Sequence, residues 1–92
     1  MKIKQNDNGK RGGFFIEQES RTVAKMTYSW AGESRIIIDH TEVDASLKGK
    51  GVGKQLVAQA VLFARERNIK ILPLCPFARS VFEKMSEYQD VL

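Results

Sequence analysis

The chain has 92 residues, of which 42% are hydrophobic and 28% are charged, and this balance excludes a disordered chain. At this length residues 1–92 form a single domain with one core, which excludes two lobes with a cleft between them. The formal net charge of +4 fits either a solvated basic surface or an anionic partner, and the single cysteine excludes an intrachain disulfide.

The first half of the sequence predicts four strands in an antiparallel meander. Apolar and polar residues alternate between Thr22 and Trp30, which is the period of a half-buried strand. Turn-forming residues at 6–9, 12–13 and 31–34 separate the strands. The four predicted strands are Lys2–Gln5, Phe14–Glu17, Thr22–Trp30 and Arg35–Val43.

The second half changes to a helical period. Apolar residues recur at helical spacing between Val52 and Arg67, so we expect a helix there. A short buried strand over 69–74 follows, and Pro76 is typical of the first turn of a second helix, which runs to about Met85. The strand–helix–strand passage predicts a parallel pair. We therefore expect an α+β fold with a mixed, mostly antiparallel sheet of about five strands and two main helices.

A glycine-rich loop joins the fourth strand to the first helix. Its glycines at 49, 51 and 53 let the backbone approach an anion, and the helix that starts near Val52 directs free N–H groups at the same place. The loop does not fit the nucleoside-triphosphate pattern, because its glycine spacing differs and Gln55 stands where a magnesium-binding Ser or Thr is needed. The dinucleotide fingerprint also fails, because Lys54 takes the place of its last glycine.

The loop resembles the acetyl-CoA pyrophosphate loop of the GCN5-related N-acetyltransferases, whose usual form is Val-x-Pro-x-x-Arg/Gln-Gly-x-Gly-x-Gly/Ala. Here it reads from Val43 to Gly53, with Ala45 in place of Pro and Lys48 in place of Arg or Gln. A second stretch, from Ala78 to Met85, resembles the Ala-x-x-x-Tyr-Glu-Lys signature of the family's last helix. The two motifs occur in the expected order.

The resemblance extends to a small, single-domain branch of this family. That branch carries an Asp/Asn-His-Thr-Glu-Val block, here 39–43, and a Pro-Leu-Cys-Pro-Phe block, here 73–77. The resemblance implies that the fourth and fifth strands splay apart, that the pantetheine arm of acetyl-CoA or coenzyme A pairs with the fourth strand, and that the pyrophosphate lies on the glycine loop. The residues implied in cofactor binding are Thr41, Val43, Lys48, Gly49, Lys50, Gly51, Val52, Gly53, Lys54 and Phe82.

Two residues are candidates for catalysis. Cys75 precedes Pro76 and so lies at a helix N-terminus, where the helix dipole favours a thiolate; a small buried hydrophobic residue is the alternative. His40, the only histidine, ends the fourth strand and is the candidate to reach Cys75 across the splay, although a surface histidine fits the same position. The acetyl group passes either directly to an acceptor amine or first to Cys75.

Two departures from the family pattern favour a different function. Phe82 stands where many relatives carry the tyrosine that protonates the departing thiolate, and only residues 6–13 stand where larger relatives carry two helices. A non-catalytic module that binds or senses acyl-CoA is therefore the alternative to an N-acetyltransferase. A nucleic-acid-binding domain ranks last, because no clustered basic stripe or aromatic platform supports it.

The sequence also bears on the partners and the location of the protein. The acceptor is an amine on a small molecule or a protein, which the sequence does not identify. The first six residues lack the apolar run of a secretory signal, and no segment approaches the length of a membrane span. We expect a cytoplasmic protein without a membrane partner.

Overall fold

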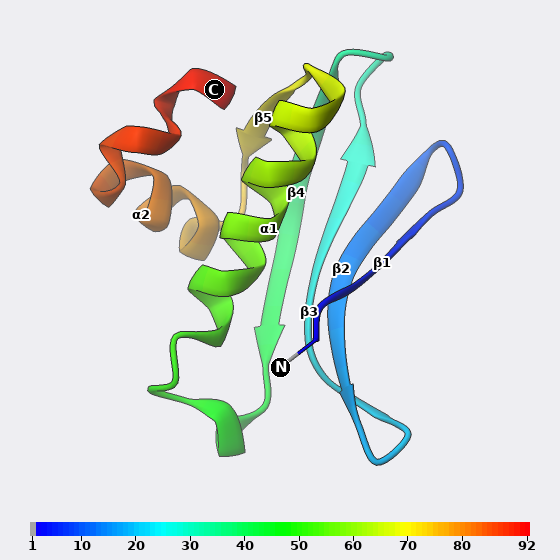
Figure 1. Ribbon diagram of the computed structural model, residues 1–92, viewed down its shortest axis with the longest axis vertical. Helices are drawn as coiled ribbons and strands as arrows, with labels where there is room; N and C mark the ends of the chain where they lie inside the picture. The colour runs from blue at the N-terminus through cyan, green and yellow to red at the C-terminus, as the bar shows by residue number, and fades with distance from the viewer. Residues whose placement is uncertain (1) are drawn as a thin grey trace.

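The computed structural model describes residues 2–92 as one five-stranded sheet with helices on one face (Figure 1). The strands lie in the order β1-β2-β3-β4-β5, antiparallel except for the parallel pair β4-β5. This confirms the α+β class and the parallel crossover. The elements are β1 Lys4–Asp7, β2 Arg11–Gln18, β3 Arg21–Trp30, β4 Arg35–Val43, the 3-10 helix η1 Ala45–Leu47, α1 Val52–Arg67, β5 Lys70–Pro73, α2 Pro76–Lys84 and the 3-10 helix η2 Ser86–Val91.

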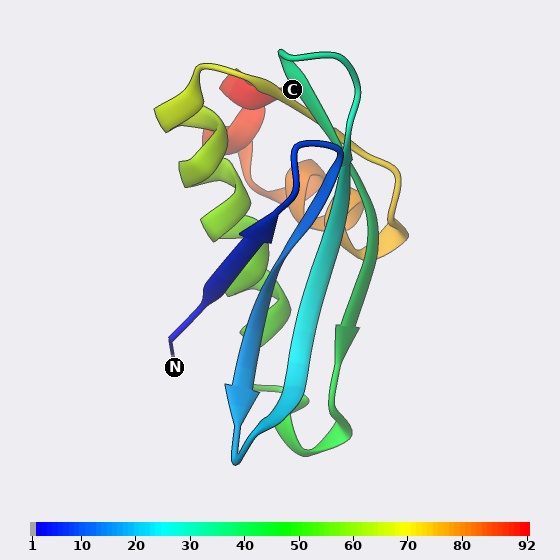
Figure 2. The same ribbon diagram turned by 90° about the vertical axis from the view of Figure 1, so that its right-hand side faces the viewer.

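Both main helices cover the same face of the sheet. Helix α1 packs against β2, β3, β4 and β5, and α2 packs against α1, β4 and β5 (Figures 1 and 2). We call this the inner face; the outer face carries no helix within residues 2–92. No helix in this range combines the length and the apolar character that a membrane crossing needs.

The first hairpin differs from the prediction. The strand predicted over Lys2–Gln5 lies at Lys4–Asp7, and the two glycines predicted as a turn lie inside β2. A Cβ at Gly12 would lie 2.5 Å from the carbonyl oxygen of Asn6 and 2.6 Å from the hydroxyl of Tyr28. Gly12 therefore belongs to the strand because the neighbouring strand and a tyrosine leave no room for a side chain. The turn itself lies at 8–10.

An aromatic cluster fills the core at the end of the sheet away from the glycine loop. Phe14, Tyr28 and Phe63 contact one another, and Trp30 contacts Tyr28 and Phe63, with ring centroids between 5.6 and 6.3 Å apart. The Tyr28 hydroxyl donates to Asp7 Oδ2 at 2.6 Å, and the Trp30 indole donates to the same oxygen at 2.8 Å. These bonds connect β1 to β3 across the intervening strand.

We predict that Tyr28→Phe destabilises the fold by about 1–2 kcal/mol, because it removes hydrogen bonds to a partly buried carboxylate and to Gln5. Burial and the neighbouring Asp7 raise the pKa of Tyr28 to about 12 from its ordinary 10. The folded state therefore disfavours tyrosinate, so this stabilisation is complete below pH 10 and is lost as the pH rises toward 12. Urea unfolding of both proteins across that range tests this: their stabilities should converge as the pH rises, and a constant difference would contradict it.

Candidate active site

The candidate site begins where β4 and β5 part. Their parallel register runs from Arg35 opposite Lys70 to Ile38 opposite Pro73. The Ile38 carbonyl then accepts hydrogen bonds from the N–H groups of Leu74 at 3.0 Å and Cys75 at 3.1 Å. β5 ends there, whereas β4 continues to Val43. The second half of β4 therefore has no strand partner on its β5 side, as the splay prediction requires.

A β-bulge lies in β4 at the same point. Tyr28 pairs with Ile38, but the next residue back along β3, Thr27, pairs with His40, so Asp39 is the extra residue. The Asp39 carboxylate accepts from the hydroxyls of Thr27 at 2.6 Å and Ser29 at 3.1 Å. Burial raises the pKa of Asp39, but the hydrogen bonds from these two hydroxyls oppose it, and the pKa lies below its ordinary value. The carboxylate therefore stays ionised and holds the bulge from the outer face.

The bulge decides which β4 side chains face inward. Beyond it Thr41 pairs with Met26, a fully buried core residue, so the Thr41 side chain points to the inner face. The N–H of Asp44 donates to Val23 on β3 at 2.8 Å. Because backbone groups alternate along a strand, those of Thr41 and Val43 point away from β3, into the gap that β5 leaves.

Cys75 meets Thr41 across this gap. Its Sγ lies 3.4 Å from Thr41 Oγ1, and the thiol is only 6% exposed. Cys75 is also the N-cap of α2, whose first residue is Pro76. The Cys75 side chain forms no capping hydrogen bond, so the N–H groups of the first turn of α2 face the sulfur without a partner in the helix.

The surroundings of Cys75 favour its thiolate. Burial raises the pKa of the thiol, but the Thr41 hydroxyl, the N–H groups of Ala78 and Phe77 and the Thr41 backbone together outweigh burial, and the pKa falls below its ordinary value. A lowered pKa and a position at a helix N-terminus are typical of reactive cysteines.

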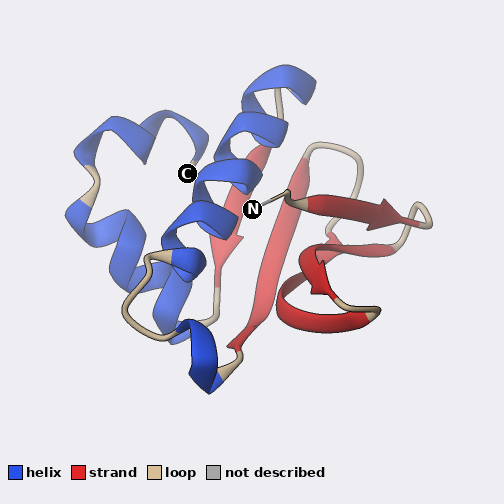
Figure 3. Cartoon of the chain, turned by 60° about the horizontal axis from the view of Figure 1, so that its bottom comes forward, coloured by secondary structure: helices blue, strands red, loops and turns tan. Residues whose placement is uncertain are grey.

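The glycine loop lies next to this gap, between the end of β4 and the start of α1 (Figure 3). Gly49 and Gly51 have φ of +79° and +72°, the left-handed region that favours glycine, and nothing lies within 4 Å of where their Cβ atoms would be. Gly51 caps α1 without a side-chain hydrogen bond, and the first turn of α1 contains no acidic residue. The first N–H groups of α1 are therefore free for an anion, with the exposed Lys48, Lys50 and Lys54 nearby in the sequence.

Gly53 has a role that the sequence did not reveal. A Cβ on it would lie 2.5 Å from Cζ of Phe77, in the first turn of α2. The absence of a side chain lets the Phe77 ring, 39% exposed, rest on the start of α1. The contact holds the N-termini of α1 and α2 side by side. In the sequence, the signal that could have pointed to Phe77 is its position in the Pro-Phe pair directly after Cys75.

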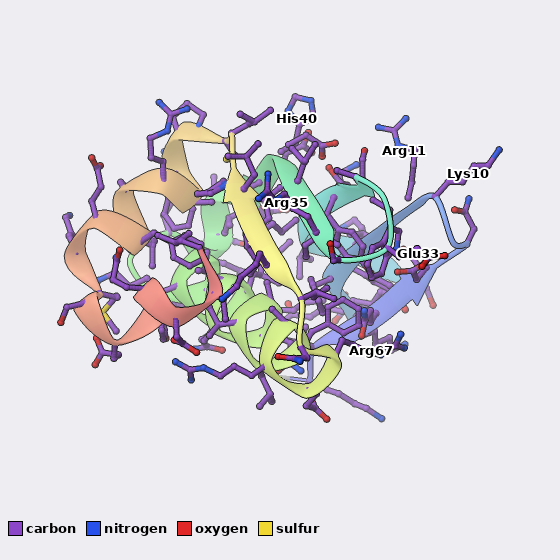
Figure 4. All side chains as sticks on the ribbon, turned by 90° about the horizontal axis from the view of Figure 1, so that it is seen from above. Lys10, Arg11, Glu33, Arg35, His40 and Arg67 are labelled. Carbon is purple, nitrogen blue, oxygen red and sulfur yellow. The ribbon has the colours of Figure 1, made fainter. Side chains whose placement is uncertain are left out.

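Two of the sequence candidates lie elsewhere. His40 pairs with Thr27 on the outer face and points away from the helices (Figure 4), so it is Thr41 and not His40 that meets Cys75. The bulge at Asp39 causes this difference. Phe82 is 2% exposed and packs edge-on against Tyr88, with centroids 6.0 Å apart. Its ring belongs to the core of the α2 and η2 segment.

The family model for GCN5-related N-acetyl-transferases matches residues 13–91. The chain belongs to this family. A GCN5-like protein from Staphylococcus aureus, known from its solution structure, is 43% identical with a TM-score of 0.77, and the match covers 98% of this chain and 85% of that one. No protein among the curated ones matches.

More distant structures of larger acetyltransferases share the fold. A ribosomal-protein-alanine N-acetyltransferase from Brucella melitensis biovar Abortus has a TM-score of 0.70 at 19% identity, over 85% of this chain and 62% of its own. A predicted acetyltransferase from Clostridium acetobutylicum, crystallised with acetyl-CoA, has a TM-score of 0.68 at 19% identity, over 84% of this chain and 57% of its own. This GCN5-related chain therefore matches little more than half of each.

We predict that Gly53→Ala destabilises the protein by about 1–3 kcal/mol, because the new methyl group would overlap the Phe77 ring. The matched background is the Phe77→Ala variant. There, Gly53→Ala should stabilise the protein by up to about 1 kcal/mol, since alanine forms helices better than glycine. Urea unfolding of the four proteins measures this double-mutant cycle. An equal effect of Gly53→Ala in both backgrounds would exclude the contact.

We further predict that Thr41→Val raises the pKa of Cys75, because it removes the hydroxyl that stabilises the thiolate. The rate of alkylation by iodoacetamide, followed by mass spectrometry against pH, should shift to higher pH and fall several-fold at neutral pH. Thr22→Val, at an exposed position of β3, is the control and should leave the profile unchanged. An unchanged profile in Thr41→Val would remove Thr41 from the environment of the sulfur.

Proposed function

We propose that this GCN5-related protein is an N-acetyltransferase that uses acetyl-CoA and carries the acetyl group on Cys75 before transfer to an amine. The observation that supports this most is the position of Cys75: its sulfur lies against Thr41 at the point where β4 and β5 part, at the N-terminus of α2. The family membership and a fold shared with a protein crystallised with acetyl-CoA support the choice of donor.

The residues of the gap and the loop fit acetyl-CoA. In the proposed complex the free backbone groups of Thr41 and Val43 hydrogen-bond the amides of the pantetheine arm. The N–H groups of Val52, Gly53 and Lys54, at the start of α1, receive the pyrophosphate, because no cap and no acidic side chain compete for them. Gly49, Lys50 and Gly51 allow the close approach, and Lys48, Lys50 and Lys54 supply positive charge.

The chemistry follows from the thiolate of Cys75. Acetyl-CoA supplies an activated acetyl thioester. The Cys75 thiolate forms a new S–C bond with the acetyl carbonyl carbon, the bond from that carbon to the sulfur of coenzyme A breaks, and coenzyme A leaves as its thiolate. We propose that the N–H groups of Phe77 and Ala78, which help to lower the pKa of Cys75, also stabilise the charge that develops on the acetyl oxygen. An amine then attacks the acetyl-cysteine, and the Cys75 thiolate is released again.

A base on the outer face of the sheet is positioned in this proposal to accept the proton that the attacking amine loses. Beyond Ile38, Thr41 lies on the inner side of β4, and the exposed His40 and Glu42 lie on its outer side. We propose that the acceptor approaches from the outer face and that His40 takes the proton that the attacking amine loses. This assigns His40 to the acceptor half of the reaction rather than to activation of Cys75.

A second candidate function, an acyl-CoA-binding module without turnover, is favoured by one observation. The ring of Phe82 is buried in the core, so α2 offers no acid at that position to protonate a departing thiolate. The relay through Cys75 does not need that acid if coenzyme A leaves as a thiolate. The two candidates therefore differ in whether the acetyl group reaches the protein.

We predict that native mass spectrometry after incubation with acetyl-CoA detects a covalent acetyl group on Cys75 of the wild-type protein. Cys75→Ala should bind acetyl-CoA without acetylation, because the loop and the gap remain intact. The control is Thr22→Val, which should be acetylated like the wild type. Binding without acetylation of any variant would support the binding module or direct transfer, and no binding at all would contradict the proposed donor site.

A further inference from the structure

A cavity lies along the edge of β5 that faces away from β4 and the proposed donor site. Its volume is about 700 Å³, and it follows the free edge of β5 between that strand, α2 and the carboxyl-terminal residues. Its apolar walls include Leu72 and Leu92, which are 41% and 45% exposed. A cavity of this size and character with a few polar groups is the usual form of a binding site.

The backbone of β5 presents an unpaired edge to this groove. The N–H group of Lys70 donates to Ser34, just before β4, and that of Leu74 donates to Ile38 in β4, so the backbone groups of every second residue face β4. Those of Ile71 and Pro73 therefore face the free edge. Ile71 offers one N–H and one carbonyl group, and Pro73 offers a carbonyl group only, since proline has no N–H. An extended backbone can pair with these groups over a short stretch.

Two arginines give the groove its charge. Arg35, from β4, and Arg79, from α2, both line it, and Figure 4 shows Arg35 next to β5. Among residues 2–92 neither guanidinium group has a carboxylate within ion-pairing distance. Arg79 makes only a long contact, 3.4 Å, to the Leu74 carbonyl. Glu83 is the one acidic side chain in the lining, so the side chains that line the groove carry a net positive charge.

We propose that this groove binds an extended, apolar segment of a partner protein that carries acidic side chains. The free edge of β5 pairs with the backbone of the segment, the apolar walls receive alternate side chains, and Arg35 and Arg79 pair with carboxylates. This binding site is separate from the acetyl-transfer chemistry. The two sites lie near each other in the chain, because Arg79 in the groove contacts the carbonyl group of Leu74, the residue before Cys75.

A second copy of this chain fits the groove less well. Two copies joined edge to edge about a two-fold axis would bring the same residues together, so Arg35 and Arg79 of one copy would face those of the other. Like charges at an interface are unfavourable. Pro73 also limits the ladder that two identical edges would form. The charge of the groove therefore favours an acidic segment over self-association.

The test uses the full ¹⁵N-labelled chain and two blocked peptides, acetyl-Glu-Leu-Thr-Val-Glu-amide and its lysine counterpart acetyl-Lys-Leu-Thr-Val-Lys-amide. We expect the acidic peptide to shift the amide signals of Ile71, Leu72 and Arg79, and the basic peptide to leave them unchanged. Arg35→Gln and Arg79→Gln should each weaken binding by roughly two- to fivefold, as expected for an exposed ion pair. Lys10→Gln, the same charge change on the distant β1–β2 hairpin (Figure 4), should have no effect.

A second pair of variants tests the apolar wall. Leu72→Glu places a negative charge in the groove and should abolish binding of the acidic peptide, whereas Leu62→Glu, at an exposed leucine of α1 outside the groove, should not. No shift with the acidic peptide, or equal binding of both peptides, would overturn the proposal. Sodium octanoate producing the same shifts would assign the groove to a small carboxylate instead of a peptide. Acetylation of Cys75 does not enter any of these readouts.

Discussion

The site depends on one carbonyl oxygen. Ile38 accepts the last two hydrogen bonds of the β4–β5 pair, from Leu74 and Cys75, and these bonds fix both where β5 ends and where α2 begins. If β5 continued along β4, the backbone groups of Thr41 and Val43 would be paired within the sheet. Because it does not, the same backbone groups are free, and the sulfur of Cys75 lies opposite them.

The Asp39 bulge and the Gly53–Phe77 contact complete the arrangement. The bulge turns Thr41 toward the inner face, and hydroxyls of β3 hold it in place by binding Asp39. The Phe77 ring rests on Gly53 and so keeps the N-termini of α1 and α2 together. Two helix N-termini then point their free N–H groups at neighbouring places. The N-terminus of α1 suits a phosphate, and that of α2 suits a thiolate or an acetyl oxygen. An enzyme that uses acetyl-CoA has to bind both kinds of group.

Much of the fold could be predicted from the sequence because its signals are local. The bounds of α1 and β4 are as predicted, since periodicity and flanking glycines define them. The prediction placed the glycines at 12 and 13 in a turn, whereas they lie in β2. The reason that Gly12 belongs in a strand is its contact with Tyr28, which the sequence does not show. The partner of Cys75 was misjudged for a similar reason: a bulge depends on pairing with β3, and a period-two reading of β4 cannot show it. The contact between Phe77 and Gly53 and the groove along β5 likewise depend on tertiary packing, which the sequence alone does not show.

Chemical-shift mapping with coenzyme A tests most directly whether the parting of β4 and β5 forms the donor site. Titration of the ¹⁵N-labelled protein should give the largest amide shifts at Thr41 and Val43, in residues 49–54, and in the first turn of α2. Residues on the outer face of β3, such as Thr22, should change little. Shifts that are absent from the glycine loop, or that centre on the outer face of the sheet, would contradict the account.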